Sequence, residues 1–176
     1  MNKPNIELQD NLPDGATIAS LILSLDKTQL SVFQGDKSAW PVYLTLGNIS
    51  KEVQCQPSAH ATIHLGYLPV AKLECCTEAT RSLAGYHLFH FCMSKILEPL
   101  VKAGKDSIEI TCSDGLIQLF YLILAAYVAD YPEQCLMTCC MENHCPQCTI
   151  SPNNHGDNVK SLYRDHETML NIFEEH

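Results

Sequence analysis

The order of the apolar segments constrains the fold of this chain more strongly than any other feature. Residues 18–25, 40–46 and 60–68 are apolar runs of strand length, and turn-forming residues separate them. Such runs predict β-strands, and the turn signals between the first two predict a hairpin. Residues 80–102 then carry apolar side chains at steps of three and four, which is the period of an amphipathic helix. The first half of the chain therefore predicts three strands followed by one long helix.

The predicted helix contains two residues that commonly break helices. Pro99 is expected to kink or end the last turn, because proline lacks the N–H that an interior helical residue donates. Gly104 is a natural stop, since glycine readily adopts the left-handed conformation that ends many helices. The sequence therefore predicts that the helix ends before Gly104.

Two further apolar segments follow the helix. Residues 107–112 alternate apolar and polar side chains, which predicts a half-buried strand, and Ser113-Asp114-Gly115 predicts a turn. Residues 117–128 are almost entirely apolar and predict a buried strand, or a strand with a short helix. The apolar block is too short for a transmembrane helix, which needs roughly 18 residues or more.

This order of elements predicts an α/β domain with a mixed β-sheet flanked by helices, a class that includes the RNase H-like fold. The apolar fraction of 46% and the charged fraction of 18% are typical of a globular protein. We divide the chain into a poorly ordered lead-in (1–17), the α/β domain (18–134), a Cys/His-rich loop (135–157) and a helical tail (158–176).

The net charge of −9, with only 11 lysines and arginines, bears on nucleic-acid binding. Proteins that grip duplex DNA neutralise its phosphates with many basic side chains. The acidic balance therefore predicts weak nonspecific affinity for nucleic acid.

The 10 cysteines are expected to be unpaired thiols, because no secretory leader opens the sequence and an intracellular, reducing compartment follows. Cys145 and Cys148 have the two-residue spacing with which a knuckle presents two thiolates to zinc, and Cys135 and Cys140 are close enough in sequence to complete four ligands. Cys139, His144 and His155 are nearby candidates. Since a single such pair is half of a zinc site, reduced free cysteines are the alternative.

Two aspartates stand directly after apolar strands. Asp26 follows residues 18–25, and Asp130 follows residues 117–128. Ligands of α/β sheets bind beyond the carboxyl ends of strands, so these carboxylates could share a hard cation such as Mg²⁺. The alternative is that both aspartates only end strands and begin turns. Asp114 also follows a strand, but Asp-Gly is a common tight-turn pair.

Several strings of the chain resemble Plavaka transposases. They are residues 25–30 (LDKTQL), 35–49 (GDKSAWPVYLTLGNI), 66–69 (GYLP), 95–100 (KILEPL), 127–134 (YVADYPEQ) and 145–148 (CPQC). The resemblance covers roughly residues 18–148, which is most of the chain.

The resemblance implies a DDE-type transposase of fungal transposable elements, related to the CACTA-like class. Such enzymes are expected in the nucleus, where an RNase H-like domain with three acids binds Mg²⁺ or Mn²⁺ and cleaves and transfers DNA strands. Asp26 would be the first acid and Asp130 the second. The third acid, a Glu, is expected beyond a long insertion, whereas this sequence stops at His176. We therefore expect a partial catalytic domain that is inactive alone.

A second hypothesis belongs to another class of protein. The region from Cys135 to His155 could instead make the chain a non-catalytic, zinc-stabilised interaction module.

Overall fold

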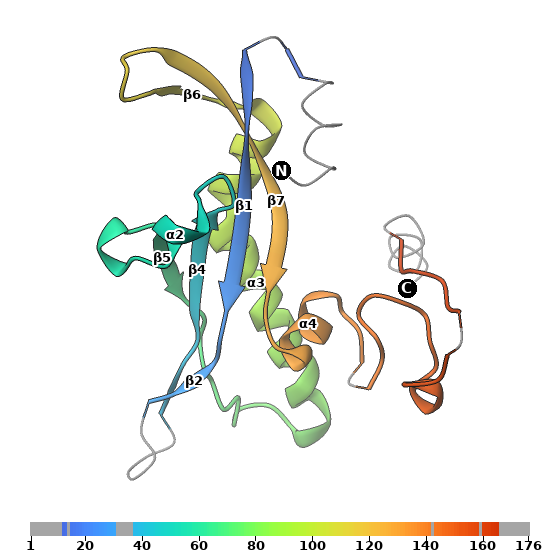
Figure 1. The fold of residues 1–176 in the computed structure, drawn as a ribbon. Helices are drawn as coiled ribbons and strands as arrows, with labels where there is room; N and C mark the ends of the chain where they lie inside the picture. Colours follow the sequence, from blue (N-terminus) through green and yellow to red (C-terminus); the bar gives the residue numbers. More distant parts are fainter. Residues whose placement is uncertain (1–11, 14, 31–36, 142, 159, 166–176) are drawn as a thin grey trace. The chain divides into compact units, whose positions relative to one another are not determined.

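The computed structural model describes residues 12–13, 15–30, 37–141, 143–158 and 160–165 (Figure 1). The chain divides into two compact units, Met1–Val128 and Ala129–His176, and each unit is described by itself. The predicted lead-in falls largely outside the described residues. The first strand begins at Ala16, two residues before the predicted boundary.

A mixed five-stranded sheet forms the centre of the first unit (Figure 1). Its strands are β1 (Ala16–Leu25), β4 (Pro41–Leu46), β5 (Thr62–Tyr67), β6 (Ile108–Thr111) and β7 (Ile117–Val128), in the order β5-β4-β1-β7-β6. β1, β4 and β5 form an antiparallel meander, and β7 lies parallel to β1. β6 and β7 form an antiparallel hairpin. The predicted α/β class with a mixed sheet is confirmed.

The predicted hairpin between the first two long strands is also confirmed. β1 and β4 are antiparallel, with Leu25 opposite Val42. Beyond these residues the chain continues as the short ladder of β2 (Thr28–Gln29) and β3 (Ser38–Ala39). The turn predicted at residues 35–36 lies outside the described residues.

A side chain extends the β1–β4 ladder beyond the end of β4. Asn48 donates from its amide nitrogen to the Ile18 carbonyl at 2.9 Å, and its amide oxygen accepts from the Ser20 N–H at 2.8 Å. The side chain thus replaces the backbone partner that β1 would otherwise lack, because buried backbone groups need hydrogen bonds.

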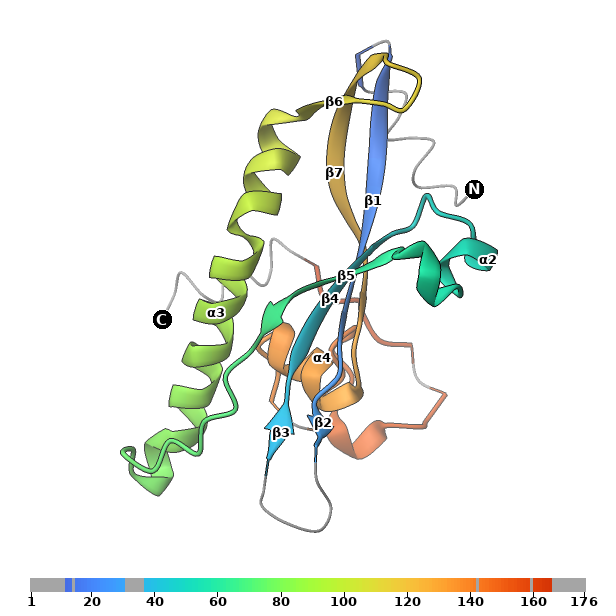
Figure 2. The same ribbon diagram turned by 90° about the vertical axis from the view of Figure 1, so that its left-hand side faces the viewer.

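The long helix α3 (Glu78–Asp106) covers one face of the sheet (Figure 2). Leu97, Leu100 and Val101 of α3 face Leu21 and Leu23 of β1 across an apolar pocket. The prediction of one long helix here is confirmed.

The predicted end of this helix was wrong. Pro99 lies inside α3, and the helix continues through Gly104 to Asp106, where Ser107 takes a positive φ of 61°. Tertiary packing supplies most helix stability, so the apolar side that α3 turns to the sheet outweighs the hydrogen bond that Pro99 removes. Gly104 does not end the helix but lets it pack closely against β7, because a Cβ there would stand only 3.0 Å from the Leu122 carbonyl oxygen.

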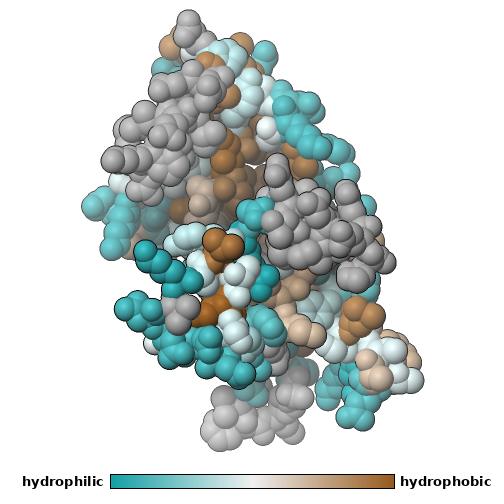
Figure 3. Space-filling view, turned by 90° about the vertical axis from the view of Figure 1, so that its right-hand side faces the viewer, coloured by the Kyte–Doolittle hydropathy of each residue, from teal (hydrophilic) through white to brown (hydrophobic). Residues whose placement is uncertain are grey.

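The burial of β7 also differs from the prediction. The segment is a strand throughout, but all of its residues are half-buried or exposed, with Ile117 68% and Leu124 51% exposed. The reason is its place in the sheet: its outer neighbour β6 is itself exposed along its whole length. Figure 3 shows apolar side chains that reach the surface between hydrophilic ones on one face of the molecule.

Two short helices between β4 and β5 were not predicted from the sequence. They are α2 (Lys51–Gln54) and the 3₁₀ helix η1 (Pro57–Ala59), neither of which buries a residue. Helices this short carry no apolar periodicity that a sequence pattern could reveal.

The second unit contains the helix α4 (Tyr131–Met137), the 3₁₀ helix η2 (Pro152–Asn154) and an isolated bridge between Cys148 and Tyr163. The start of the predicted Cys-rich loop is thus helical, because α4 includes Cys135. Residues 160–165 of the predicted helical tail form no helix. The rest of that tail, apart from residue 158, lies outside the described residues.

Candidate metal and substrate site

The first candidate acid stands at the carboxyl end of the most buried strand. β1 ends at Leu25, which is 4% exposed, and Asp26 follows it on the surface. The Thr28 hydroxyl lies 3.4 Å from one Asp26 carboxylate oxygen and 3.3 Å from the Asp26 carbonyl oxygen, and it can donate to either. These contacts are long for hydrogen bonds, so they hold the Asp26 side chain only weakly. The end of β1 determines where the Asp26 backbone lies.

The register of the central strands shows that β1 and β7 end together. Their parallel pairing runs from Ala16 opposite Leu119 to Ser24 opposite Val128, with one irregularity after Leu21. Asp26 comes two residues after Ser24 in the chain, and Asp130 comes two residues after Val128. The strand ends that precede the two candidate acids are therefore direct neighbours.

The second candidate acid caps a helix. Asp130 precedes α4, and its Oδ1 accepts from the Glu133 N–H at 2.9 Å. Pro132 occupies the first turn, where a missing N–H costs nothing. A cap uses one oxygen of the carboxylate. The sequence signal for this helix was available, because Asp followed by Pro and Glu is a typical helix start.

Asp114, the third strand-end acid, has a purely local role. Its Oδ1 accepts from the Leu116 N–H at 2.9 Å, and Gly115 between them has a φ of 82°. The predicted turn at this position is confirmed.

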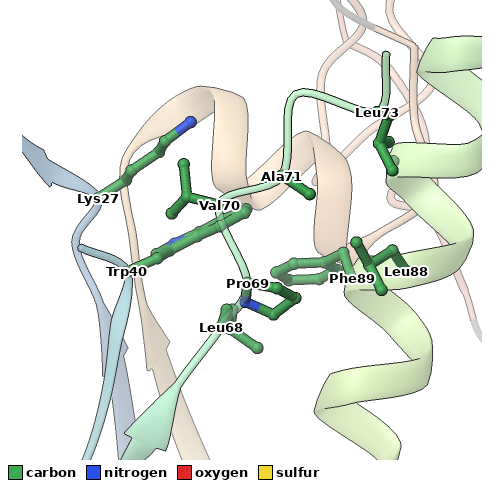
Figure 4. A pocket seen from close by; sticks show the side chains of 10 residues that line it. Lys27, Trp40, Leu68, Pro69, Val70, Ala71, Leu73, Leu88 and Phe89 are labelled. Atoms are coloured by element: carbon green, nitrogen blue, oxygen red, sulfur yellow. The ribbon is translucent and has the colours of Figure 1, made fainter. Parts of the chain in front are cut away.

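A pocket lies beside Lys27, the residue that follows Asp26 in the chain (Figure 4). Its volume is about 100 Å³, and its walls come from the segments that follow β1 and β5, the residue before β4 and the first half of α3. The lining residues are Lys27, Trp40, Leu68, Pro69, Val70, Ala71, Leu73, Gly85, Leu88 and Phe89. The sequence analysis missed this pocket, because residues 68–73 form a loop whose position no periodicity predicts.

Trp40 is the main aromatic group of this pocket. Its ring lies 5.3 Å from the Phe89 ring, and Lys27 Nζ lies 5.6 Å from the Trp40 centroid. In Figure 4 Lys27 and Val70 lie on one side of the indole, and Pro69 and Phe89 lie on the other. The indole N–H is buried and has no acceptor among the described residues. Leaving a buried donor unpaired costs about 1–3 kcal/mol, so an acceptor at this position would be stabilising.

The candidate zinc ligands of the second unit fall into two groups. Cys135 and Cys140 are buried, and their thiols point to carbonyls: Cys135 Sγ lies 3.5 Å from the His144 oxygen, and Cys140 Sγ lies 3.7 Å from the Thr138 oxygen. Cys145 and Cys148 are half-buried, and Cys145 is among the groups that lower the pKa of Cys148. The two buried thiols therefore have backbone carbonyls as partners.

Polar neighbours favour the thiolate of Cys148. A hydrogen bond from Ser161, one from the Ile150 backbone and one from Cys145 hold the pKa of Cys148 below its usual value. Cys139 behaves in the opposite way, because burial raises the pKa of its thiol. Arg164 fixes the loop by donating from Nε to the Cys145 carbonyl at 2.9 Å.

No group of three or more His, Cys, Asp or Glu in the described part of the chain is arranged to hold a metal ion. The fit to zinc is thus a pair of thiols, which is half of a tetrahedral site. Asp26 and Asp130 are each a carboxylate of the kind that hard cations prefer, and they belong to different units of the chain. Both metal sites stay predictions.

No helix in the described ranges is long and apolar enough to cross a membrane. A search of curated proteins finds no match for the chain. The model of the Plavaka transposase family, in contrast, matches residues 1–176, the entire sequence. This match includes the strings that precede and follow both candidate acids. The chain therefore belongs to the Plavaka transposase family.

Proposed function

We propose that this chain is a transposase-derived protein whose sheet is the RNase H-like domain of a DDE enzyme that acts on DNA in the nucleus. The family match supports the transposase origin. The fold supports the domain type, since an antiparallel meander is followed by a helix, by the short strand β6 and by a strand parallel to β1. In this proposal Asp26 and Asp130 are the first two acids of the triad.

The observation that carries the proposal is the register between β1 and β7. Because Ser24 and Val128 are partners, the strand ends that precede the two acids in the chain lie at the same edge of the sheet, and this supports the proposal. Carboxylates at such an edge suit Mg²⁺ or Mn²⁺, which prefer oxygen ligands. When bound, the ions of such sites stabilise the attacking and leaving oxygens of a phosphoryl transfer.

The chain's own residues prepare this edge. The buried strand β1 holds the backbone of Asp26, and the helix cap holds Oδ1 of Asp130 in one direction. We expect no DNA cleavage by the 176-residue chain alone, because the triad needs three acids and only Asp26 and Asp130 occupy matching positions in it.

The direct test is Mn²⁺ binding by three asparagine variants. Asp26→Asn and Asp130→Asn should each weaken Mn²⁺ binding on the order of tenfold or more, because each removes a charged ligand. Asp130→Asn also keeps the helix cap, since asparagine caps as well as aspartate. Asp114→Asn is the matched control and should leave binding unchanged. Equal binding by all variants would contradict the shared site.

The second candidate is a zinc-stabilised interaction module, favoured by the thiol pair of Cys145 and Cys148. The described residues supply no further ligand beside this pair. A zinc assay separates the two proposals: about one zinc per chain that is lost in Cys145→Ser, with unfolding of the second unit on chelation, would support the module. A chain that binds no zinc would exclude it.

A further inference from the structure

We propose that the pocket between Trp40 and α3 binds an unpaired pyrimidine base of DNA next to the Asp26 strand end. This inference rests on the proposed function, since it assigns a substrate subsite to the same edge of the sheet. Its walls belong entirely to the first unit of the chain.

The chemistry of the pocket fits a nucleotide. Leu68 and Phe89 at its floor are 3% exposed each, and with Leu88 they offer apolar surface to a flat ring. The indole N–H of Trp40 is a buried donor without an acceptor in the described structure, and pyrimidines carry carbonyl acceptors on their edges. A flat, apolar site with one unpaired donor selects a planar ligand that has an acceptor.

Lys27 can supply a positive charge for the phosphate of such a nucleotide. Its side chain is exposed, and its ammonium lies over the Trp40 ring without an ion pair in the described part of the chain. A long lysine side chain can move from the ring to a neighbouring phosphate at small cost. Because Lys27 directly follows Asp26, that phosphate would lie next to the candidate catalytic edge.

The size of the pocket favours a single ring. A cavity of about 150 Å³ accommodates benzene. The pocket here has about 100 Å³, and its rim residues Lys27, Pro69 and Val70 are exposed, so part of a ligand can extend into solvent. A six-membered pyrimidine fits this space better than a bicyclic purine. Bases leave the helix most easily where they are unpaired, as at a strand end.

Trp40 is the single tryptophan of the chain, so its fluorescence reports the pocket directly. The test uses the 176-residue chain at low ionic strength with dye-labelled DNA hairpins. One hairpin has an overhang of thymidines, one an overhang of adenosines, one an abasic overhang with the same phosphates, and one a blunt end. Fluorescence anisotropy of the dye measures total binding, and Trp40 quenching measures occupancy.

We expect the thymidine overhang to quench Trp40 fluorescence and to bind on the order of tenfold more tightly than the abasic overhang. A gain of this size is typical of one base that stacks on an aromatic side chain. The adenosine overhang should bind less tightly than the thymidine overhang. Lys27→Gln should weaken the binding of all three overhang probes relative to the blunt probe and lower the salt slope by about one. Lys51 is an exposed lysine on α2, so Lys51→Gln is the control. It should leave the ratio of overhang affinity to blunt-end affinity unchanged.

Filling the pocket gives the decisive variant, because it keeps Trp40. A Cβ at Gly85 would stand 3.9 Å from Leu73 Cδ1, which is ordinary contact, so Gly85→Ala should fold like the unmodified chain. Gly85→Leu places a branched side chain into the pocket and also favours the helix. It should abolish the extra affinity of the thymidine overhang and leave blunt DNA binding intact.

The outcomes separate the two levels of the proposal. If blunt DNA binds but thymidine and abasic overhangs bind and quench equally, or if Gly85→Leu still prefers thymidine, the pocket inference is wrong and the proposed function stands. If adenosine and thymidine bind equally, the size selection is wrong. If no DNA probe binds, the proposed DNA function fails together with the inference.

Discussion

The two central strands β1 and β7 have similar apolar sequences but very different surroundings. Seven residues of β1 are buried, and Leu23 is only 1% exposed. β7 has no buried residue, and Leu124, the partner of Leu21 in the register, is 51% exposed. β1 lies between two long strands, whereas β7 lies between β1 and the short, exposed β6. Apolar composition therefore identifies a strand, but its neighbours decide how much of it is buried.

The difference matters for the candidate site, because each strand leads to one of the two acids. The burial of β1 fixes the backbone before Asp26. The less buried β7 leads to Asp130, whose carboxylate is positioned by the cap of α4. Burial of the preceding strand thus holds the backbone before Asp26, whereas a hydrogen bond holds the side chain of Asp130.

The comparison is tested most strongly by truncating one leucine on each strand. Leu23→Ala should lower the free energy of unfolding by about 2–5 kcal/mol, as is usual for a buried leucine. Leu124→Ala should cost less than about 1 kcal/mol, because half of the side chain is already in solvent. Urea denaturation followed by circular dichroism measures both. Equal losses would show that β7 is covered in solution.

The contact between α3 and β7 gives the next largest effect. Gly104→Ala should destabilise the first unit by about 1–3 kcal/mol through overpacking, since the new Cβ would stand 3.0 Å from the Leu122 carbonyl oxygen. Gly85→Ala on the same helix should instead stabilise it by roughly 0.5–1 kcal/mol through helix propensity. Thermal melts of the two variants compare them directly. A stabilising Gly104→Ala would mean that α3 stands further from β7.

The two acids should differ in their effect on stability. Asp130→Ala should cost about 1 kcal/mol, because it removes the cap of α4, and Asp130→Asn should cost almost nothing. Asp26→Ala should change stability by less than about 0.5 kcal/mol, as is usual for an exposed residue with weak contacts. Urea denaturation with a probe in each unit measures these changes. A large loss in Asp26→Ala would assign that residue a structural role.

Much of this organisation follows from local sequence patterns. The apolar runs and turn signals predict every long strand, and the three- and four-residue period predicts α3. The end of α3 is not predictable in this way, because Pro99 and Gly104 follow local rules that packing against the sheet overrides. The exposure of β7 depends on which strand lies beside it, which no run of residues encodes.

The site shows the same division. The positions of Asp26 and Asp130 after strands are visible in the sequence, and the Asp-Tyr-Pro-Glu start of α4 was a readable signal that the prediction of a loop overlooked. The pocket around Trp40 combines four separate segments, so only the fold brings Lys27, Leu68 and Phe89 together. The two-residue spacing of Cys145 and Cys148 is visible in the sequence, whereas the local partners of Cys135 and Cys140 depend on the fold after α4.

The central proposal is that Asp26 and Asp130, which follow β1 and β7 in the chain, bind one divalent ion together. The most direct measurement is paramagnetic broadening of backbone amide signals by substoichiometric Mn²⁺ in nuclear magnetic resonance spectra. We predict that signals near Asp26 and near Asp130 broaden together, and that Asp26→Asn abolishes the broadening at both places. Broadening at one aspartate that persists when the other is replaced would contradict a shared site.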